Sequence, residues 1–282
     1  MTGWTETYRG AVPPWQCDVT EHFTVAYYFD RLEEADANLA NELGLGDLLR
    51  RDDLLRRIDA HFARELRAGA SFHVESAALG VENELRLGHR FVDSTNGDTV
   101  TWFEEHWHLA APLTPQQRRA IETRPAVWNG PTAETRPEPT TTDGFIPTAR
   151  GRVKTCDVDA AGHFALGAIV HRFSNASGQL DAAIGMDTYF MQQQRRGFST
   201  FELILHVSGA LRLDEPYLVK SGVAHLGNSS LRKFHRMTNP QTGAGVAQLS
   251  QFGVNLDLDA RRPAHWPTEI RERAAALLVP VG

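Results

Sequence analysis

The sequence contains few cysteines, no long apolar run and no excess of basic residues. Only Cys17 and Cys156 occur among 282 residues, which excludes a disulfide framework and leads us to expect a reducing cytoplasm. No run approaches the roughly 18 apolar residues that span a bilayer, and no secretory signal pattern is visible, so no membrane association is expected. The net charge of −6 argues against general nucleic-acid binding, because no basic surplus exists to neutralise phosphates.

Two segments of the chain repeat one pattern, which indicates an internal duplication. The first, from Cys17 to Leu45, reads CDVTEHFTVAYYFDRLEEADANLANELGL. The second, from Val158 to Met186, reads VDAAGHFALGAIVHRFSNASGQLDAAIGM. Adding 141 to the residue number maps Asp18 of the first copy onto Asp159 of the second without a gap. Such self-similarity predicts one supersecondary unit that is used twice.

A second pair of matched segments supports the duplication. ELRLGHRFVDSTNGDTV begins at Glu84 and SLRKFHRMTNPQTGAGV begins at Ser230, now with an offset of 146. This offset pairs His89 with His235. The two matched blocks occur in the same order in each copy, so the chain is predicted to contain two equivalent modules.

Each copy carries the apolar pattern of a helix, with steps of three and four residues. These positions are Val25, Tyr28, Phe29, Leu32, Ala35, Leu39 and Leu43 in the first copy and Leu166, Ile169, Val170, Phe173, Ala176, Leu180 and Ile184 in the second. Gly44 and Gly185 follow, where a left-handed residue is expected to end a helix. The pattern predicts one helix of about 20 residues in each module.

Strand-like composition follows each predicted helix, roughly over residues 58–109 and 200–258. Asn96-Gly97 and Thr242-Gly243 lie between strand-like runs and indicate hairpin turns. A long helix followed by antiparallel strands forms an α+β unit in which the sheet wraps the helix. We therefore predict a double hotdog fold, with two tandem modules that form an intramolecular pseudo-dimer.

The predicted boundaries divide the chain into four parts. Residues 1–110 form the first module, 111–149 a linker rich in proline and threonine, 150–260 the second module, and 261–282 a C-terminal helix and tail. The linker holds seven of the fourteen prolines and is expected to be extended or turn-like. The terminal helix is predicted from Glu269 to Leu278, outside the sheet.

The loop and helix of each copy resemble the signature of the 4-hydroxybenzoyl-CoA thioesterase-like branch of the hotdog superfamily. That signature is roughly D-x-x-G-H-x-N, followed on the helix by an aromatic residue and F-x-E-A. Matching residues are Asp18, His22, Tyr28, Glu34 and Ala35 in the first copy and Asp159, Gly162 and His163 in the second. The second copy is also similar to plant-type acyl carrier protein thioesterases, which are double hotdogs. Departures from the pattern are Glu21 and Thr24 in the first copy and Ala165 and Asn175 in the second.

The resemblance implies hydrolysis of an acyl-CoA or acyl carrier protein thioester. No metal or redox cofactor is expected, and coenzyme A enters only as part of the substrate. By this resemblance, Asp18 or Asp159 attacks the carbonyl or activates water. Amides around His22-Phe23 or His163-Phe164, near a helix N-terminus, would polarise the carbonyl.

The candidate site residues follow from the two loops and the two matched strands. The catalytic candidates are Asp18, His22, Glu34, Asp159 and His163, and the substrate-binding candidates are Phe23, Thr24, Gly162, Phe164, His89, Arg90, His235 and Arg236. We expect activity in the first copy, because Glu33 or Glu34 would supply a second carboxylate that orients water.

Structural roles for the same residues stay open. Asp18 and Asp159 also suit helix caps or turns, and the loop histidines suit hydrogen bonds that hold the loop. The repeated His-Arg pairs on the matched strands suit either coenzyme A phosphates or salt bridges on a strand face.

Other functions remain as alternatives. His106-Trp107-His108 with His73 suggests a metal site, but no cysteine and no clear third ligand accompany these histidines, so none is expected. An acyl-CoA hydratase or dehydratase is disfavoured because the hydratase D-x4-N-P-x-H pattern is missing. A non-catalytic module that binds acyl-CoA or mediates an interaction is the main alternative, since fold does not fix function. Further association of double-hotdog units into a homo-oligomer also stays open.

Overall fold

A computed structural model describes residues 3–50, 54–109 and 112–282 of the chain. The first module contains β1 (Thr5–Ala11), η1 (Pro14–Gln16), α1 (Val25–Glu42), η2 (Leu48–Arg50), β2 (Leu55–Phe62), β3 (Ser71–Val81), β4 (Leu85–Asp93) and β5 (Thr99–His108). The second contains β6 (Ile146–Arg152), η3 (Thr155–Asp157), α3 (Leu166–Ile184), α4 (Thr188–Gln194), β7 (Arg196–Val207), β8 (Pro216–Leu226), β9 (Ser230–Thr238) and β10 (Gly245–Asp257). The remaining elements are α2 (Pro115–Glu122), β11 (Arg262–Pro263) and α5 (Thr268–Ala276).

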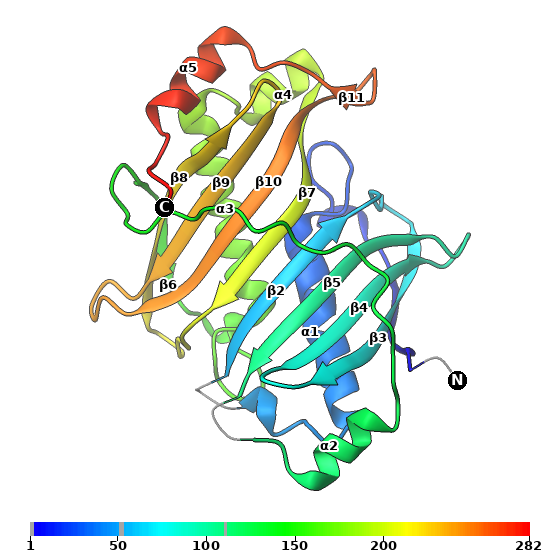
Figure 1. The fold of residues 1–282 in the computed structure, drawn as a ribbon. Coiled ribbons are helices and arrows are strands. Elements are labelled where there is room, and N and C mark those ends of the chain that lie inside the picture. Colours follow the sequence, from blue (N-terminus) through cyan, green and yellow to red (C-terminus); the bar gives the residue numbers. More distant parts are fainter. Residues whose placement is uncertain (1–2, 51–53, 110–111) are drawn as a thin grey trace.

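The strands of both modules form one antiparallel sheet. Its order is β1-β3-β4-β5-β2-β7-β10-β9-β8-β6, with β11 paired to β10. Strands β2 and β7 join the halves, and Ile58 lies opposite Leu205 at their junction. The long helices α1 and α3 lie on the same face of this sheet, and the linker between the modules crosses the other face (Figure 1). The predicted double hotdog is confirmed.

The two long helices form where the apolar pattern predicted them. Six of the seven predicted apolar residues of the first copy are buried, and so are all seven of the second. The rings of Phe29 on α1 and Phe103 on β5 meet edge to face at 5.2 Å, inside a core cluster shared by both modules. Gly185 ends α3 with φ of 85°, a conformation that glycine adopts without steric cost. Each helix is therefore the central packing element of its module.

The edge strands β1 and β6 were absent from the predicted strand regions. β6 begins at Ile146, four residues before the predicted start of the second module, and it contains Pro147. Proline cannot donate to a strand ladder, and it is tolerated here because β6 lies at the edge of the sheet. Because proline is typical of linkers, the sequence pattern assigned Pro147 to the predicted linker, 111–149, although it lies in β6.

The linker was predicted to be extended or turn-like, but it also contains the helix α2. A Thr114–Gln117 capping box begins α2, and Ile121 of this helix is buried beside Leu39 and Leu43 of α1. At the other end of the chain, α5 packs against α3 and β8 through Ile270. It therefore adds to the core on the helix-bearing side of the second module.

The fold predicts a large loss of stability when Phe29 is truncated. Phe29 is fully buried, so we expect Phe29→Ala to lower the free energy of unfolding by about 3–5 kcal/mol. Urea denaturation followed by fluorescence measures this change. Phe201→Ala, at a side chain that is 44% exposed, should cost less than about 1 kcal/mol. Equal losses in the two variants would contradict the assigned core.

Candidate active site

The two repeated loops adopt the same hydrogen-bonded turn. The Asp18 N–H donates to His22 O at 2.8 Å, and the Asp159 N–H donates to His163 O at 2.8 Å. The carboxylate of each aspartate turns back onto its own loop, where Oδ1 accepts the N–H of the loop histidine at 3.2 Å in the first copy and 2.9 Å in the second. Both aspartates therefore hold their turns, as the structural alternative anticipated.

The loops differ at the residue before the histidine. Glu21 has φ of 65° and its counterpart Gly162 has φ of 80°, so both lie in the left-handed region. Glycine adopts this region freely, whereas a residue with a Cβ is strained by about 1–2 kcal/mol there. The first loop therefore carries backbone strain that the second loop lacks.

The amides that were predicted to polarise a carbonyl already have partners. The Phe23 N–H donates to Leu66 O at 2.8 Å, and the Phe164 N–H donates to Leu211 O at 2.7 Å. The histidine amides are bound by the aspartate carboxylates of their own loops. These amides would have to exchange their present partners before they could bind an oxyanion, so the oxyanion role that the resemblance implies for them stays a prediction.

Each loop faces the long helix of the other module. A cavity of about 410 Å³ lies between the second loop and α1. Its lining includes Glu33, Glu34, Asp36, Arg56, Asp159, His163, Phe164 and Leu166. We call it the seam cavity. Because its two walls come from different modules, helix acids of the first copy meet the loop of the second copy.

Glu33 of α1 reaches the N-terminus of α3 across the seam cavity. Its Oε2 accepts the N–H of Gly167 at 3.3 Å, one of the amides that the first turn of a helix leaves without an intrahelical partner. A Cβ at Gly167 would overlap Asp30 of α1, so glycine is required for this close approach of the helices. The contact places a carboxylate beside the positive end of a helix dipole.

Burial raises the pKa of Glu33 to about 7. The hydrogen bond from Gly167 and the charge of Arg56 oppose this effect, whereas the charges of Asp159 and Asp36 reinforce it. A carboxylate with such a pKa exchanges a proton near neutral pH, which is the range that suits a general base. Glu33 therefore lines the cavity, contacts the N-terminus of α3, and has a pKa that suits a base at neutral pH.

The equivalent cavity of the other loop lacks this carboxylate. It measures about 250 Å³ and lies between the first loop, with Asp18, and α3. Ser174 stands at the position that corresponds to Glu33, and a buried ion pair joins Lys233 Nζ to Asp181 at 2.7 Å. The expected activity of the first loop is thus not supported, because the acids of its helix line the other cavity.

The remaining loop candidates are divided between the two cavities. His22 Nε2 lies 3.0 Å from Glu65 Oε2 beside the smaller cavity, where Thr24 is also found. Glu34 pairs with Arg31 at 2.9 Å and is mostly exposed at the margin of the seam cavity. Phe23, Phe164 and His163 are buried, and the last two line the seam cavity.

In each matched His-Arg pair, the histidine points to one face of the sheet and the arginine to the other. His89 and His235 are fully buried beneath the helices. Arg90 pairs with Glu75, and Arg236 donates to Pro139 O of the linker on the outer face. None of these four side chains lines either cavity of the described chain, so this structure does not support their predicted contact with substrate.

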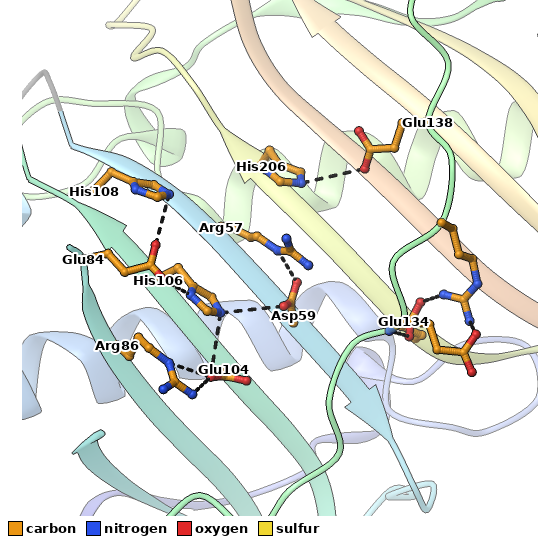
Figure 2. A network of polar contacts seen from close by, with 12 residues as sticks. Arg57, Asp59, Glu84, Arg86, Glu104, His106, His108, Glu134, Glu138 and His206 are labelled. Atoms are coloured by element: carbon orange, nitrogen blue, oxygen red, sulfur yellow. Dashed lines mark hydrogen bonds and ion pairs between the residues drawn. The ribbon is translucent and has the colours of Figure 1, made fainter. Parts of the chain in front are cut away.

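The outer face of the sheet carries a network of histidines and acids. His106 and His108 of β5 both contact Glu84, the residue just before β4, as expected for alternate residues of one strand (Figure 2). His206 on β7 lies 3.9 Å from Glu138 of the linker, so this network reaches the segment that joins the modules (Figure 2). The histidines thus help to hold the linker and the strands together.

Sequence reasoning missed several polar residues that the structure brings to the helix side of the sheet. Asp36 is buried on α1, four residues after the buried Leu32, and Glu105 is buried between Phe103 and Trp107 on β5. The sequence did offer a signal, because each acid lies at a position where the periodicity of its helix or strand predicts a buried residue. Gly167 gave no signal, because its role depends on the other module.

Known proteins resemble this chain in two ways: a family profile matches the second module, and solved structures share the fold. Residues 153–274 match the profile of a family described as the thioesterase-like superfamily. No curated protein sequence matches the chain. Among the described helices, none is long and apolar enough to cross a membrane.

Two solved structures illustrate the similarity. An acyl-ACP thioesterase from Bacteroides thetaiotaomicron VPI-5482 has a TM-score of 0.65 and 14% identity, and the match covers 89% of this chain and 98% of that chain. The 12:0-ACP thioesterase from Umbellularia californica has a TM-score of 0.64 and 14% identity, with 90% and 94% covered. At this identity the likeness establishes the shared fold.

Relief of strain in the first loop should stabilise the protein. We expect Glu21→Gly to raise the free energy of unfolding by about 0.5–1 kcal/mol, because glycine removes the left-handed penalty but adds entropy to the unfolded chain. Gly162→Ala introduces the same strain into the second loop and should lower it by about 1 kcal/mol. Chemical denaturation provides both values, and a less stable Glu21→Gly protein would refute the assignment.

Proposed function

We propose that this double-hotdog chain, whose second module matches the thioesterase-like superfamily, hydrolyses acyl thioesters in the seam cavity. The observation that carries this proposal is the contact of Glu33 with the Gly167 N–H at the start of α3. In this proposal, Glu33 is the base and the Gly167 N–H is the oxyanion donor. Thioester hydrolysis needs both groups within a few ångströms of one carbonyl.

In the proposed reaction, the thioester carbonyl oxygen takes the place of the Glu33 carboxylate at the Gly167 N–H. The released carboxylate accepts a proton from a water molecule, and this water adds to the carbonyl carbon. The tetrahedral intermediate carries its negative charge beside the α3 N-terminus, where the helix dipole favours an anion. Collapse of the intermediate breaks the carbon–sulfur bond, and the thiolate takes up the proton that Glu33 holds.

Asp159 has a positioning role in this scheme. Its Oδ1 accepts the N–H groups of Ala161 at 2.8 Å and His163 at 2.9 Å, so it shapes the loop that faces Glu33. Its charge also contributes to the raised pKa of Glu33. Asp159 is thus proposed to adjust the base, in place of the nucleophilic role that the resemblance implied.

The proposed substrates are acyl-CoA and acyl carrier protein thioesters. The cavity is lined by apolar residues such as Ala37, Leu54 and Val207 in addition to its acids, which suits an acyl group. The names of the two similar proteins specify acyl carrier protein thioesters as their substrates. Parallel assays with both carriers of the same acyl group decide between them here.

Loss of the Glu33 carboxylate should abolish turnover. We expect Glu33→Gln to lower kcat/KM for acyl thioesters at least about 100-fold, because glutamine cannot accept the proton of water. Thiol release measured with a chromogenic thiol reagent, across short, long and aromatic acyl groups, tests this. Ser174→Ala, at the equivalent position of the other cavity, is the matched control and should retain activity. Full activity of Glu33→Gln would exclude the mechanism.

The pH profile should follow the ionisation of Glu33. Because the base works when deprotonated, kcat/KM is expected to rise with pH, with a midpoint near 7. Asp159→Asn removes a charge that raises the pKa of Glu33, so the midpoint should move to lower pH in that variant. An unchanged midpoint would contradict the proposed coupling. Loss of turnover in Glu34→Gln, with activity kept in Glu33→Gln, would assign the base to Glu34 instead.

A further inference from the structure

Three buried ligand atoms converge beside the seam cavity. Asp36, His89 and Glu105 each offer one ligand atom, and these atoms all lie within 4.8 Å of one another. Asp36 Oδ1, His89 Nε2 and Glu105 Oε1 are the unpartnered atoms of these side chains. The side chains are buried, and none of the three atoms has a hydrogen-bond partner within the described chain. Asp36 Oδ1 approaches His89 Nε2 to 3.2 Å without the geometry of a hydrogen bond. Such unpartnered atoms are costly in a protein interior unless another group binds them.

Neighbouring side chains fix the orientation of all three ligands. Arg56 Nη2 donates to Asp36 Oδ2 and Glu105 Oε2, which leaves the second oxygen of each carboxylate free. Trp107 Nε1 also donates to Glu105 Oε2, at 2.6 Å. A hydrogen bond between Ser76 Oγ and His89 Nδ1, at 2.7 Å, leaves Nε2 as the inward atom. Metal ligands in proteins are commonly oriented by outer partners of this kind.

The charges of this cluster do not balance with a neutral His89. Two carboxylates and one guanidinium leave one net negative charge in a buried place. An uncompensated buried charge destabilises the folded state by several kcal/mol. A cation among the three free atoms supplies the missing positive charge.

The second module shows how the same place is filled when the acids are absent. Its Ser221 Oγ lies 2.6 Å from His235 Nδ1, which reproduces the Ser76–His89 contact. Ser177 and Gln251 stand at the positions of Asp36 and Glu105. Burial, reinforced by the charge of Lys233, lowers the pKa of His235 to about 3. A protein cation thus lies near the histidine in the module that lacks both acids.

We propose that Asp36, His89 and Glu105 bind one divalent transition-metal ion, and that this ion is Zn²⁺. One imidazole nitrogen and two carboxylate oxygens suit Zn²⁺, which takes such ligands in tetrahedral geometry. Asp36 and Arg56 line the seam cavity, so a fourth ligand can enter from there. A hydroxide as fourth ligand brings the total charge of the cluster to zero. The proposal rests on these three side chains and does not require thioester hydrolysis, and it departs from the expectation that no metal is bound.

Metal content and spectroscopy test the proposal on the intact chain. Elemental analysis should find about one zinc ion per chain in protein incubated with Zn²⁺ and then dialysed. Removal with a chelator should lower the midpoint of thermal unfolding, and Zn²⁺ should restore it. Co²⁺ in the same site should show the visible absorption of a tetrahedral ion. A chain that binds neither ion after chelation and reloading would overturn the proposal.

Two variants locate the ion. Glu105→Gln should lose at least about 10-fold in Zn²⁺ affinity, because it replaces a charged ligand with a weaker one. His235→Gln is the matched control, since it changes the equally buried histidine of the other module and should leave zinc content unchanged. Equal loss in both variants would contradict the site. If Glu105→Gln does not fold, the Co²⁺ spectrum and chelator response of the unaltered chain still decide the outcome.

A protonated His89 is the competing explanation for the cluster. In that case the imidazolium would donate to Asp36, and zinc would neither bind nor raise the unfolding midpoint. Measurements of zinc binding at pH 6 and pH 8 separate the two. Zinc that binds and raises the unfolding midpoint at either pH supports the metal site. If zinc binds at neither pH, the metal site is excluded.

Discussion

The pairing of β2 with β7 is the constraint on which the rest of the structure depends. Six matched residue pairs along these strands join two half-sheets into one. This junction brings α1 and α3 against each other on one face of the sheet. Each helix then closes the cavity of the opposite loop. Without the junction, Glu33 and Gly167 would belong to separate surfaces, and neither module would contain a complete site.

The duplication allowed the two cavities to diverge while the scaffold remained the same. Both loops keep the aspartate turn, and both modules keep the buried serine–histidine contact. Burial raises the pKa of Glu33 in the seam cavity to about 7, whereas the other cavity has Ser174 at that position and the Lys233–Asp181 ion pair. Burial also raises the pKa of Asp181, but Lys233 supplies the opposite charge. The two cavities therefore differ in how their buried acids are compensated.

The linker gives the outer face a role in holding the modules together. Arg232 and Arg236, four residues apart on β9, both donate to prolyl carbonyl groups of the linker. These carbonyls are available as acceptors because Pro137 and Pro139 lie outside any strand, so no ladder amide occupies them. The contact of His206 with Glu138 lies on the same face (Figure 2). Together these contacts fasten the linker to the face of the sheet opposite the helices.

The sequence by itself determined the duplication, both long helices, the register that pairs Asp18 with Asp159, and the double-hotdog architecture. These features follow from local periodicity and from direct comparison of the two copies. Only the tertiary structure decided which groups share a cavity. The helix acid Glu33 precedes the loop it faces by more than 120 residues, and the first-copy loop beside it in sequence faces the other module. The cluster of Asp36, His89 and Glu105 was equally hidden, because its members come from three separate elements that converge only when the sheet wraps α1. Local pattern encodes each element, but the pairing of distant strands sets which side chains meet.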